Sequence, residues 1–178
     1  HADIEDKDQT VYIPTIRTSA KDNVTGINHT EADKEVTITD TVTYKGLEVG
    51  REYTVSGTLM NQRTGAKILV NGKPVTASTT FTAEKKEGSV EVVFAFDASA
   101  LEGTTTVVYE KLYTENKEVA AHTDINDKGQ TIYIPKVRTT AIADDTKDHV
   151  TEAKKDVTIV DTVSYEGLEV GREYTVKG

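Results

Sequence analysis

The chain has 178 residues, a formal net charge of −9 and a pI near 5.0, and it contains no cysteine. An acidic chain without a clustered run of basic residues is a poor match for nucleic acid, so we expect no nucleic-acid partner. No apolar run approaches the roughly 18 residues of a membrane span and no signal peptide opens the chain, which predicts no membrane insertion.

The sequence repeats with a period of 121 residues. His1–Gly57 aligns without a gap to His122–Gly178, and 36 of these 57 pairs are identical. A period of this length is a normal domain size, large enough for its own core. We therefore expect a tandem array in three parts: residues 1–14 as the last strand of a preceding repeat, 15–135 as one complete repeat, and 136–178 as the first strands of a following, incomplete repeat.

The first two predicted strands hold a nucleophile and an unexpected carboxylate. Residues 15–20 read as a strand with Thr18 on the same face as Ile16, and a polar loop follows over 21–34. In the next strand, 35–44, Asp40 lies in the apolar row of alternate residues. A lone buried carboxylate costs several kcal/mol unless it is paired or protonated, so Asp40 needs a partner.

The rest of the repeat continues as short strands separated by turns. Asn71-Gly72 signals a hairpin turn, Asp97–Leu101 is expected to form one helical turn capped by Asp97, and 126–129 is a turn. Strand patterns cover 51–61, 67–70, 75–82, 89–96, 104–113 and 130–134. About eight strands with almost no helical signal predict an all-β protein, an antiparallel β-sandwich of immunoglobulin-like kind.

Five polar residues share the predicted core-facing side of this unit. For Glu110 the alternation does not decide which face points inward, because both faces of its strand carry apolar groups. The first and last strands of a sandwich can lie side by side, which would bring Thr18 near Gln130. The chemistry that this set permits is acyl transfer: a hydroxyl, deprotonated by a base, attacks a side-chain amide and ammonia leaves. The set is Thr18, Asp40, Glu110, His122 and Gln130.

These residues resemble the intramolecular ester-bond domains, the TQ or VaFE-type repeats, of cell-surface adhesins in Gram-positive bacteria. The resemblance rests on Arg17-Thr18, on Asp40 in ITDTVTYKGL, on Glu110 in VVYEK, and on the stretch from His122 to Gln130 in HTDINDKGQT. It spans essentially the whole chain and implies a CnaB-like sandwich in tandem repeats. Tyr109 stands where the family usually has Phe.

The resemblance implies a role for each residue. Thr18 is the nucleophile and Gln130 the electrophile of a spontaneous ester crosslink. His122 is the general base, Asp40 orients the histidine or stabilises charge, and Glu110 polarises the amide or donates a proton. Matching but incomplete sites occur in the broken repeats, where we expect no intramolecular ester: His1, Gln9, Thr139 and Asp161.

The predicted function is therefore a structural stalk repeat of a bacterial surface adhesin, extracellular on the cell surface or cell wall. It needs no cofactor, and no metal is expected because Lys128 and Pro135 break the calcium-loop pattern that Asp124, Asn126 and Gly129 suggest. We expect no enzyme activity beyond one autocatalytic turnover. The expected partners are neighbouring repeats, with the host ligand unknown. Two alternatives stay open: a sandwich with a Lys-Asn isopeptide bond, and a ligand-binding adhesin domain without a crosslink.

Overall fold

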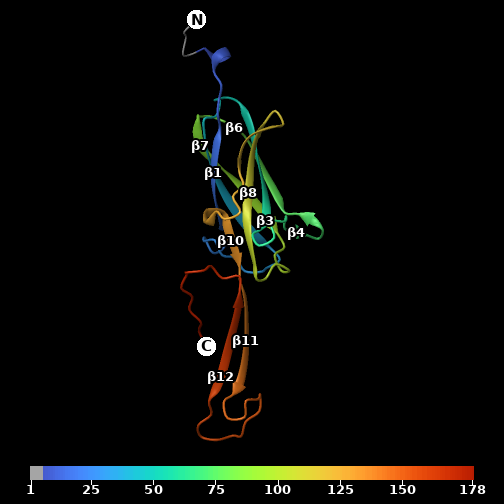
Figure 1. Cartoon of the computed structure of the whole chain (residues 1–178), viewed down its shortest axis with the longest axis vertical. Helices are drawn as coiled ribbons and strands as arrows, with labels where there is room; N and C mark the ends of the chain where they lie inside the picture. Colours follow the sequence, from blue (N-terminus) through green and yellow to red (C-terminus); the bar gives the residue numbers. More distant parts are fainter. Residues whose placement is uncertain (1–5) are drawn as a thin grey trace.

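The computed structural model describes residues 6–178 and consists of a β-sandwich with a separate β-hairpin at its C-terminal end (Figure 1). One sheet has the strand order β1-β2-β7 and the other the order β10-β8-β3-β6, with β9 also paired to β8. Every pairing between these strands is antiparallel. The sandwich strands are β1 (Thr15–Asp22), β2 (Val36–Lys45), β3 (Glu52–Asn61), β6 (Thr76–Thr82), β7 (Glu87–Phe96), β8 (Thr104–Thr114), β9 (Lys117–His122) and β10 (Thr131–Ile134).

The core lies between the two sheets, and strict alternation along the strands builds it. In β2 the alternate residues from Val36 to Tyr44 are all buried, and the interleaved threonines face outward. The opposite sheet contributes Val55 and Leu59 from β3 and Leu112 from β8, none of them exposed. The predicted antiparallel β-sandwich is therefore confirmed.

A short hairpin extends from the sandwich at the predicted turn. β4 (Leu69–Val70) pairs with β5 (Lys73–Pro74), and the two residues between them, Asn71 and Gly72, have φ values of 51° and 76°. Two successive positive φ values are the geometry of a tight hairpin turn, and Asn-Gly is the residue pair that tolerates it best.

Two expectations about local structure are wrong. Residues 97–101 form a turn without a helix; Asp97 caps it through the Ser99 N–H at 2.9 Å. Gln130 does not lie on the last strand but ends a 3₁₀ helix, η2 (Lys128–Gln130), directly before β10.

The first and last strands do not pair side by side. β1 is the edge strand of one sheet and β10 the edge strand of the other. Two edge strands in different layers have no backbone hydrogen bonds between them, so side chains must make the connection. The 3₁₀ turn before β10 lies against β1 and supplies that connection.

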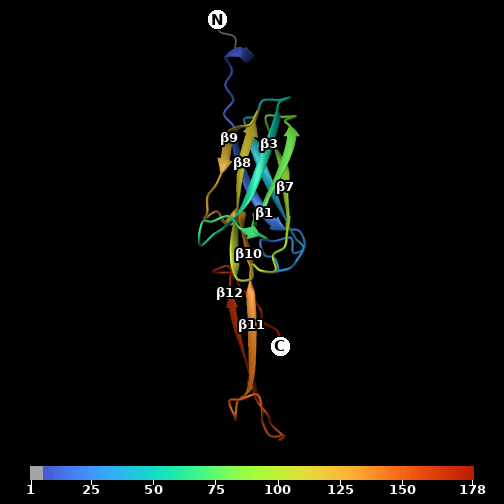
Figure 2. The ribbon, with the colours of Figure 1, turned by 90° about the vertical axis from the view of Figure 1, so that its right-hand side faces the viewer.

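Beyond the sandwich, β11 (Lys136–Ala143) and β12 (Ile159–Glu166) form a two-stranded hairpin (Figure 2). Its register repeats that of β1 and β2, since Ala141 lies opposite Asp161 as Ala20 lies opposite Asp40. Among residues 6–178 no further sheet covers it, and Val137, Ile159 and Tyr165 are 50%, 67% and 66% exposed. At the other end, residues 10–14 extend from the 3₁₀ turn η1 (Lys7–Gln9) to β1.

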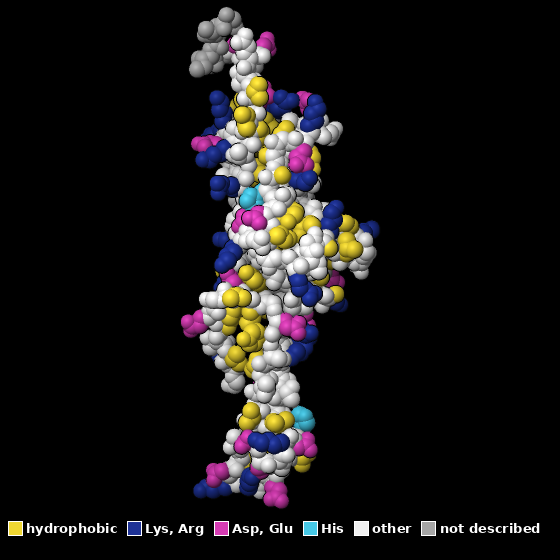
Figure 3. All heavy atoms as spheres, viewed as in Figure 1, with side chains coloured by type: hydrophobic (Ala, Val, Ile, Leu, Met, Phe, Trp, Pro, Cys, Tyr) yellow, Lys and Arg dark blue, Asp and Glu magenta, His cyan; other side chains and the backbone are white. Residues whose placement is uncertain are grey.

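The visible surface in Figure 3 mixes acidic and basic side chains, with apolar side chains exposed near the hairpin. No helix among residues 6–178 is long and apolar enough to cross a membrane.

Candidate crosslinking site

Two side chains from opposite ends of the domain meet at the edge of the sandwich. Thr18 lies half-buried on β1, and the Gln130 side chain is completely buried at the end of η2. The amide Nε2 of Gln130 donates a hydrogen bond to Oγ1 of Thr18. The hydroxyl oxygen and the amide group are therefore in direct contact, as an acyl transfer between them requires.

The turn before β10 directs Gln130 inward through a set of local hydrogen bonds to Asp127. The Asp127 carboxylate accepts the N–H of Gly129 at 2.7 Å and so caps η2. Its backbone oxygen accepts the N–H of Gln130 at 3.2 Å and the hydroxyl of Thr131 at 2.8 Å. These contacts fix the backbone on both sides of Gln130 and so hold its side chain against Thr18.

Asp40 and Glu110 form a buried carboxyl pair across the two layers. Asp40 lies on the central strand of one sheet and Glu110 on β8 of the other, and neither is exposed to solvent. None of their four oxygen atoms has a well-formed hydrogen bond while both groups are carboxylates. Two buried like charges cannot both be ionised cheaply, whereas one added proton supplies a hydrogen bond between the groups.

The pKa values of this pair are both raised. Burial, the Asp40 charge and a hydrogen bond with Asp40 together raise the pKa of Glu110 to about 9, and burial is the largest cause. Burial also raises the pKa of Asp40 to about 6, against the smaller opposing influence of Glu110, the Ser19 backbone and the Thr18 hydroxyl, which lie near the carboxyl without a hydrogen bond of good geometry. At neutral pH the pair therefore holds one proton, mainly on Glu110.

A glycine makes room for Glu110. Gly57 lies directly opposite it in the β3–β8 pairing, and a Cβ atom at Gly57 would be closer than 3.0 Å to the Glu110 carboxyl and to the Phe94 ring. The sequence signal for this role was a glycine inside the apolar row of a strand, which often marks a close approach.

His122 lies at the partly open side of the site. It pairs with Glu110 across β9 and β8, and its side chain is 23% exposed. Its Nε2 is 2.6 Å from Oδ2 of Asp127. In the tautomer that places the proton on Nε2, this contact leaves the lone pair on Nδ1.

Asp127 is the residue that the sequence reasoning missed. Asp40 was predicted to orient the histidine or to stabilise charge; the direct hydrogen-bond partner of the imidazole is Asp127, which leaves charge stabilisation as the role for Asp40. Asp40 instead lies beside the Thr18 hydroxyl and Glu110, within the electrostatic influence of His122. An acidic residue five positions after the histidine, at the start of a turn, was the available signal.

The structure does not assemble the incomplete sites. Gln9 is exposed on η1, while Thr139 and Asp161 are exposed on β11 and β12, and no other strand that the structure describes covers them. His1 lies outside the described residues. Among residues 6–178 no group of three or more His, Cys, Asp or Glu side chains is arranged to hold a metal ion.

The fold is similar to that of a known bacterial adhesin. Two crystal forms of a bacterial adhesin from Mobiluncus mulieris, described as containing intramolecular disulfide, isopeptide and ester bond cross-links, match with a TM-score of 0.56 each and with 16% and 17% sequence identity. In both, the match covers 87% of this chain and 74% of that chain. At this identity the likeness shows the fold alone. No curated protein matches the sequence.

A family model gives the more specific result. The model described as "T-Q ester bond containing domain" matches residues 14–134 and, a second time, residues 135–178. The first match includes the Thr18 and Gln130 pair, and the two matches together cover most of the chain. The chain therefore belongs to the family of T-Q ester bond containing domains.

Proposed function

We propose that residues 15–135 form a domain that crosslinks itself through an ester between Thr18 and Gln130. The observation that supports this most directly is the contact of Thr18 Oγ1 with the buried amide of Gln130. Oγ1 attacks Cδ of Gln130, a new C–O bond forms, the C–N bond breaks and ammonia leaves. The nucleophile remains in its own product, so the reaction occurs once per domain and the domain is not a turnover enzyme.

The surrounding groups suit the proton transfers that this reaction needs. His122 accepts the hydroxyl proton, and Asp127 stabilises the imidazolium that forms. The proton then passes to the departing nitrogen, which leaves as neutral ammonia. The negative charge of Asp40, which lies close to the Thr18 hydroxyl, stabilises the positive charge that develops on His122.

Glu110 is the acid that activates the amide. Its raised pKa keeps it protonated at neutral pH. The carbonyl oxygen of Gln130, Oε1, is buried without a hydrogen-bond partner. A proton donated toward that oxygen would stabilise the tetrahedral intermediate, in the same way that other buried carboxylic acids act as donors.

The crosslink would join two layers that no backbone ladder connects. It closes a loop of 113 residues from Thr18 to Gln130. In the chain-entropy model a link of this span stabilises the folded domain by about 4 to 5 kcal/mol. A pulling force that enters through Thr15 and leaves through Ile134 would pass through the ester, and the strands between the two crosslinked residues would not be extended.

The wider role follows from this mechanical property. We infer a structural repeat of a surface adhesin, exposed outside the cell, whose partners are neighbouring repeats of the same chain or polymer. The repeated family match and the Mobiluncus adhesin described with ester cross-links support this role. A chain without cysteine has no disulfides for reinforcement, and the ester would take their place.

Intact mass spectrometry tests the proposal. The folded chain should be lighter than its sequence mass by one ammonia, and hydroxylamine should restore a chain without the crosslink. Thr18→Ala should abolish the mass loss, and Thr18→Ser, which keeps the hydroxyl, should retain it. A mass loss that resists hydroxylamine would indicate an isopeptide bond instead. A mass equal to that of the sequence would leave a domain without any crosslink.

A further inference from the structure

The end of the sandwich nearest the hairpin holds a second cluster of specific contacts, far from the ester site. β10 ends at Ile134 and β11 begins at Lys136, so a single residue, Pro135, connects the two bodies. A one-residue connection limits the distance between the sandwich and the hairpin. The angle between them is set by the contacts around the connection.

On the sandwich side, His29 is fixed to the last strand. Its ring stacks on Tyr133 with centroids 5.0 Å apart and 24° between the planes. The backbone beside it is held by two hydrogen bonds, from the Thr30 N–H to the Tyr133 oxygen at 3.0 Å and from the Tyr133 N–H to the Asn28 oxygen at 2.9 Å. His29 is only 9% exposed. The Asn28–His29 corner is therefore fixed to β10, with His29 buried and Asn28 half-buried.

On the other side, residues 167–174 form a loop with a defined shape of its own. Its Glu169 N–H donates to the Tyr174 hydroxyl at 2.9 Å, and the same bond occurs 121 residues earlier between Glu48 and Tyr53 at 3.0 Å. Gly171 and Gly50 have φ values of 87° and 84°. The loop thus has the same geometry here as inside the complete domain, although residues 168–178 form no strand.

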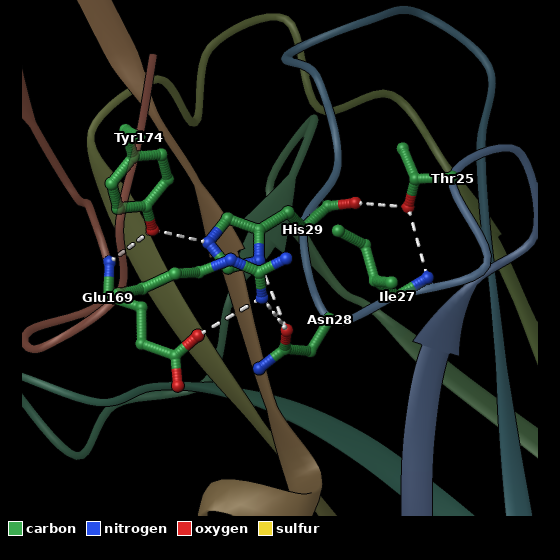
Figure 4. A network of polar contacts seen from close by, with 7 residues as sticks. Thr25, Ile27, Asn28, His29, Glu169 and Tyr174 are labelled. Carbon is green, nitrogen blue, oxygen red and sulfur yellow. Dashed lines mark hydrogen bonds and ion pairs between the residues drawn. The ribbon is translucent and has the colours of Figure 1, made fainter.

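The corner and the loop meet in one directed chain of hydrogen bonds (Figure 4). The Glu169 N–H donates to the Tyr174 hydroxyl, which donates to Nε2 of His29 at 2.7 Å. In this tautomer, Nδ1–H of His29 donates to Oδ1 of Asn28 at 3.1 Å. The same Asn28 oxygen lies 3.4 Å from Nη1 of Arg172.

The charges around His29 suit its role as an acceptor. Burial lowers its pKa, the Arg172 charge lowers it further, and Glu169 opposes the shift. The imidazole therefore stays neutral at neutral pH and keeps the lone pair that accepts the tyrosine hydroxyl.

Separate contacts hold the other side of the connection. Arg138 on β11 binds Glu102 of the sandwich through two nitrogens, with Nη1 at 3.0 Å from Oε1. The backbones of Gly167 and Gly103 touch so closely that a Cβ at Gly167 would lie 3.0 Å from the Gly103 carbonyl. Contacts at separate points around a one-residue connection resist both bending and rotation.

We propose that the Asn28–His29 corner is a docking surface for the 167–174 loop of the following repeat, and that this contact holds successive repeats at a fixed angle. The partner is specified by chemistry: the surface needs a tyrosine hydroxyl and an arginine at the spacing that this loop presents. At the matching positions 121 residues later, His149 replaces Asn28 and Val150 replaces His29. A valine side chain cannot accept a hydrogen bond from the tyrosine hydroxyl. A repeat with that pair would lack this contact.

Residual dipolar couplings of the 178-residue chain test the proposal. The sandwich and the β11–β12 hairpin should share one alignment tensor. Tyr174→Phe removes only the hydroxyl and should separate the two tensors, and it should lower the hydrogen-exchange protection of the Glu169 amide by up to about tenfold. Tyr165→Phe alters an exposed tyrosine on β12 and should change neither measurement.

The readout is independent of the ester, since the mass loss of one ammonia should persist in both variants. His29→Ala provides a second route to the same effect from the sandwich side. Independent tensors in the unmodified chain would overturn the proposal. So would a shared tensor that survives both Tyr174→Phe and His29→Ala.

Discussion

Without its crosslink, the domain should lose stability as the pH rises above neutrality. The cause is the carboxyl pair: the folded domain holds a proton on Glu110, whose pKa is raised to about 9, whereas the unfolded chain has released it. A pKa raised by folding contributes stability that is fully present below the unfolded value, near 4.3 for glutamate, and is lost as the pH passes through the folded value. The perturbation is therefore a pH increase from 7 to 9 in the Thr18→Ala background, which cannot form the ester.

The magnitude follows from one proton. Each pH unit should lower the free energy of unfolding by about 1.4 kcal/mol while the folded state holds one proton more than the unfolded state. From pH 7 to 9 the loss should be about 2 kcal/mol, because a group with a pKa of about 9 is half ionised at pH 9. This is a substantial part of a typical domain stability of about 5 to 15 kcal/mol. Asp40, with a pKa of about 6, is already ionised over this interval and adds little.

Urea unfolding followed by circular dichroism at constant ionic strength measures this slope. Glu110→Gln in the same background keeps the side-chain shape and removes the titrating group, so its profile should be nearly flat. An equally steep slope in that variant would assign the proton to another residue. A flat profile in Thr18→Ala itself would refute the assignment of a shared proton to the buried pair.

Three further predictions concern the site. Thr18→Ala should lower the unfolding free energy at pH 7 by about 4 to 5 kcal/mol relative to Thr18→Ser, measured as a shift of the urea midpoint; equal midpoints would contradict the loop-closure estimate. Gly57→Ala should cost about 1 to 3 kcal/mol by overpacking and slow the ammonia loss followed by mass spectrometry, while the neighbouring Ser56→Ala should not. Asp127→Asn keeps an oxygen to cap η2 but removes the charge beside His122, and should slow ester formation by about 100-fold or more; an unchanged rate would dismiss Asp127 as a catalytic partner.

The sequence predicted those parts of the site that leave a local pattern. Asp40 was identifiable because a carboxylate interrupts a row of alternating apolar residues, and the structure buries it completely. Glu110 was less certain because its strand is apolar on both faces, and that strand is indeed covered on both sides over part of its length. The strand alternation that reveals such residues depends only on neighbours two positions apart.

The missed features depend on contacts between distant elements. The partner of His122 is set by how the turn after β9 folds back, and the alternation of residues along a strand does not predict that. The assignment of β1 and β10 to different sheets depends on the whole strand order. The same holds for the Asn28–His29 corner, which lies in a polar loop and acquires meaning only when residues 133 and 174 pack against it.

The position of the proposed ester follows from the weakest connection in a sandwich. Within each sheet, neighbouring strands are joined by continuous ladders of backbone hydrogen bonds, whereas no such ladder joins β1 to β10 across the two layers. The chain enters the sandwich through β1 and leaves it through β10. A pull along the chain would therefore act first on two edge strands that belong to different layers. A covalent bond between Thr18 and the segment before β10 joins those two edges at the point where the layers would otherwise separate. The buried carboxyl pair beside it weakens the fold at high pH before the reaction, and this cost is acceptable because the product that the pair helps to form is a covalent bond.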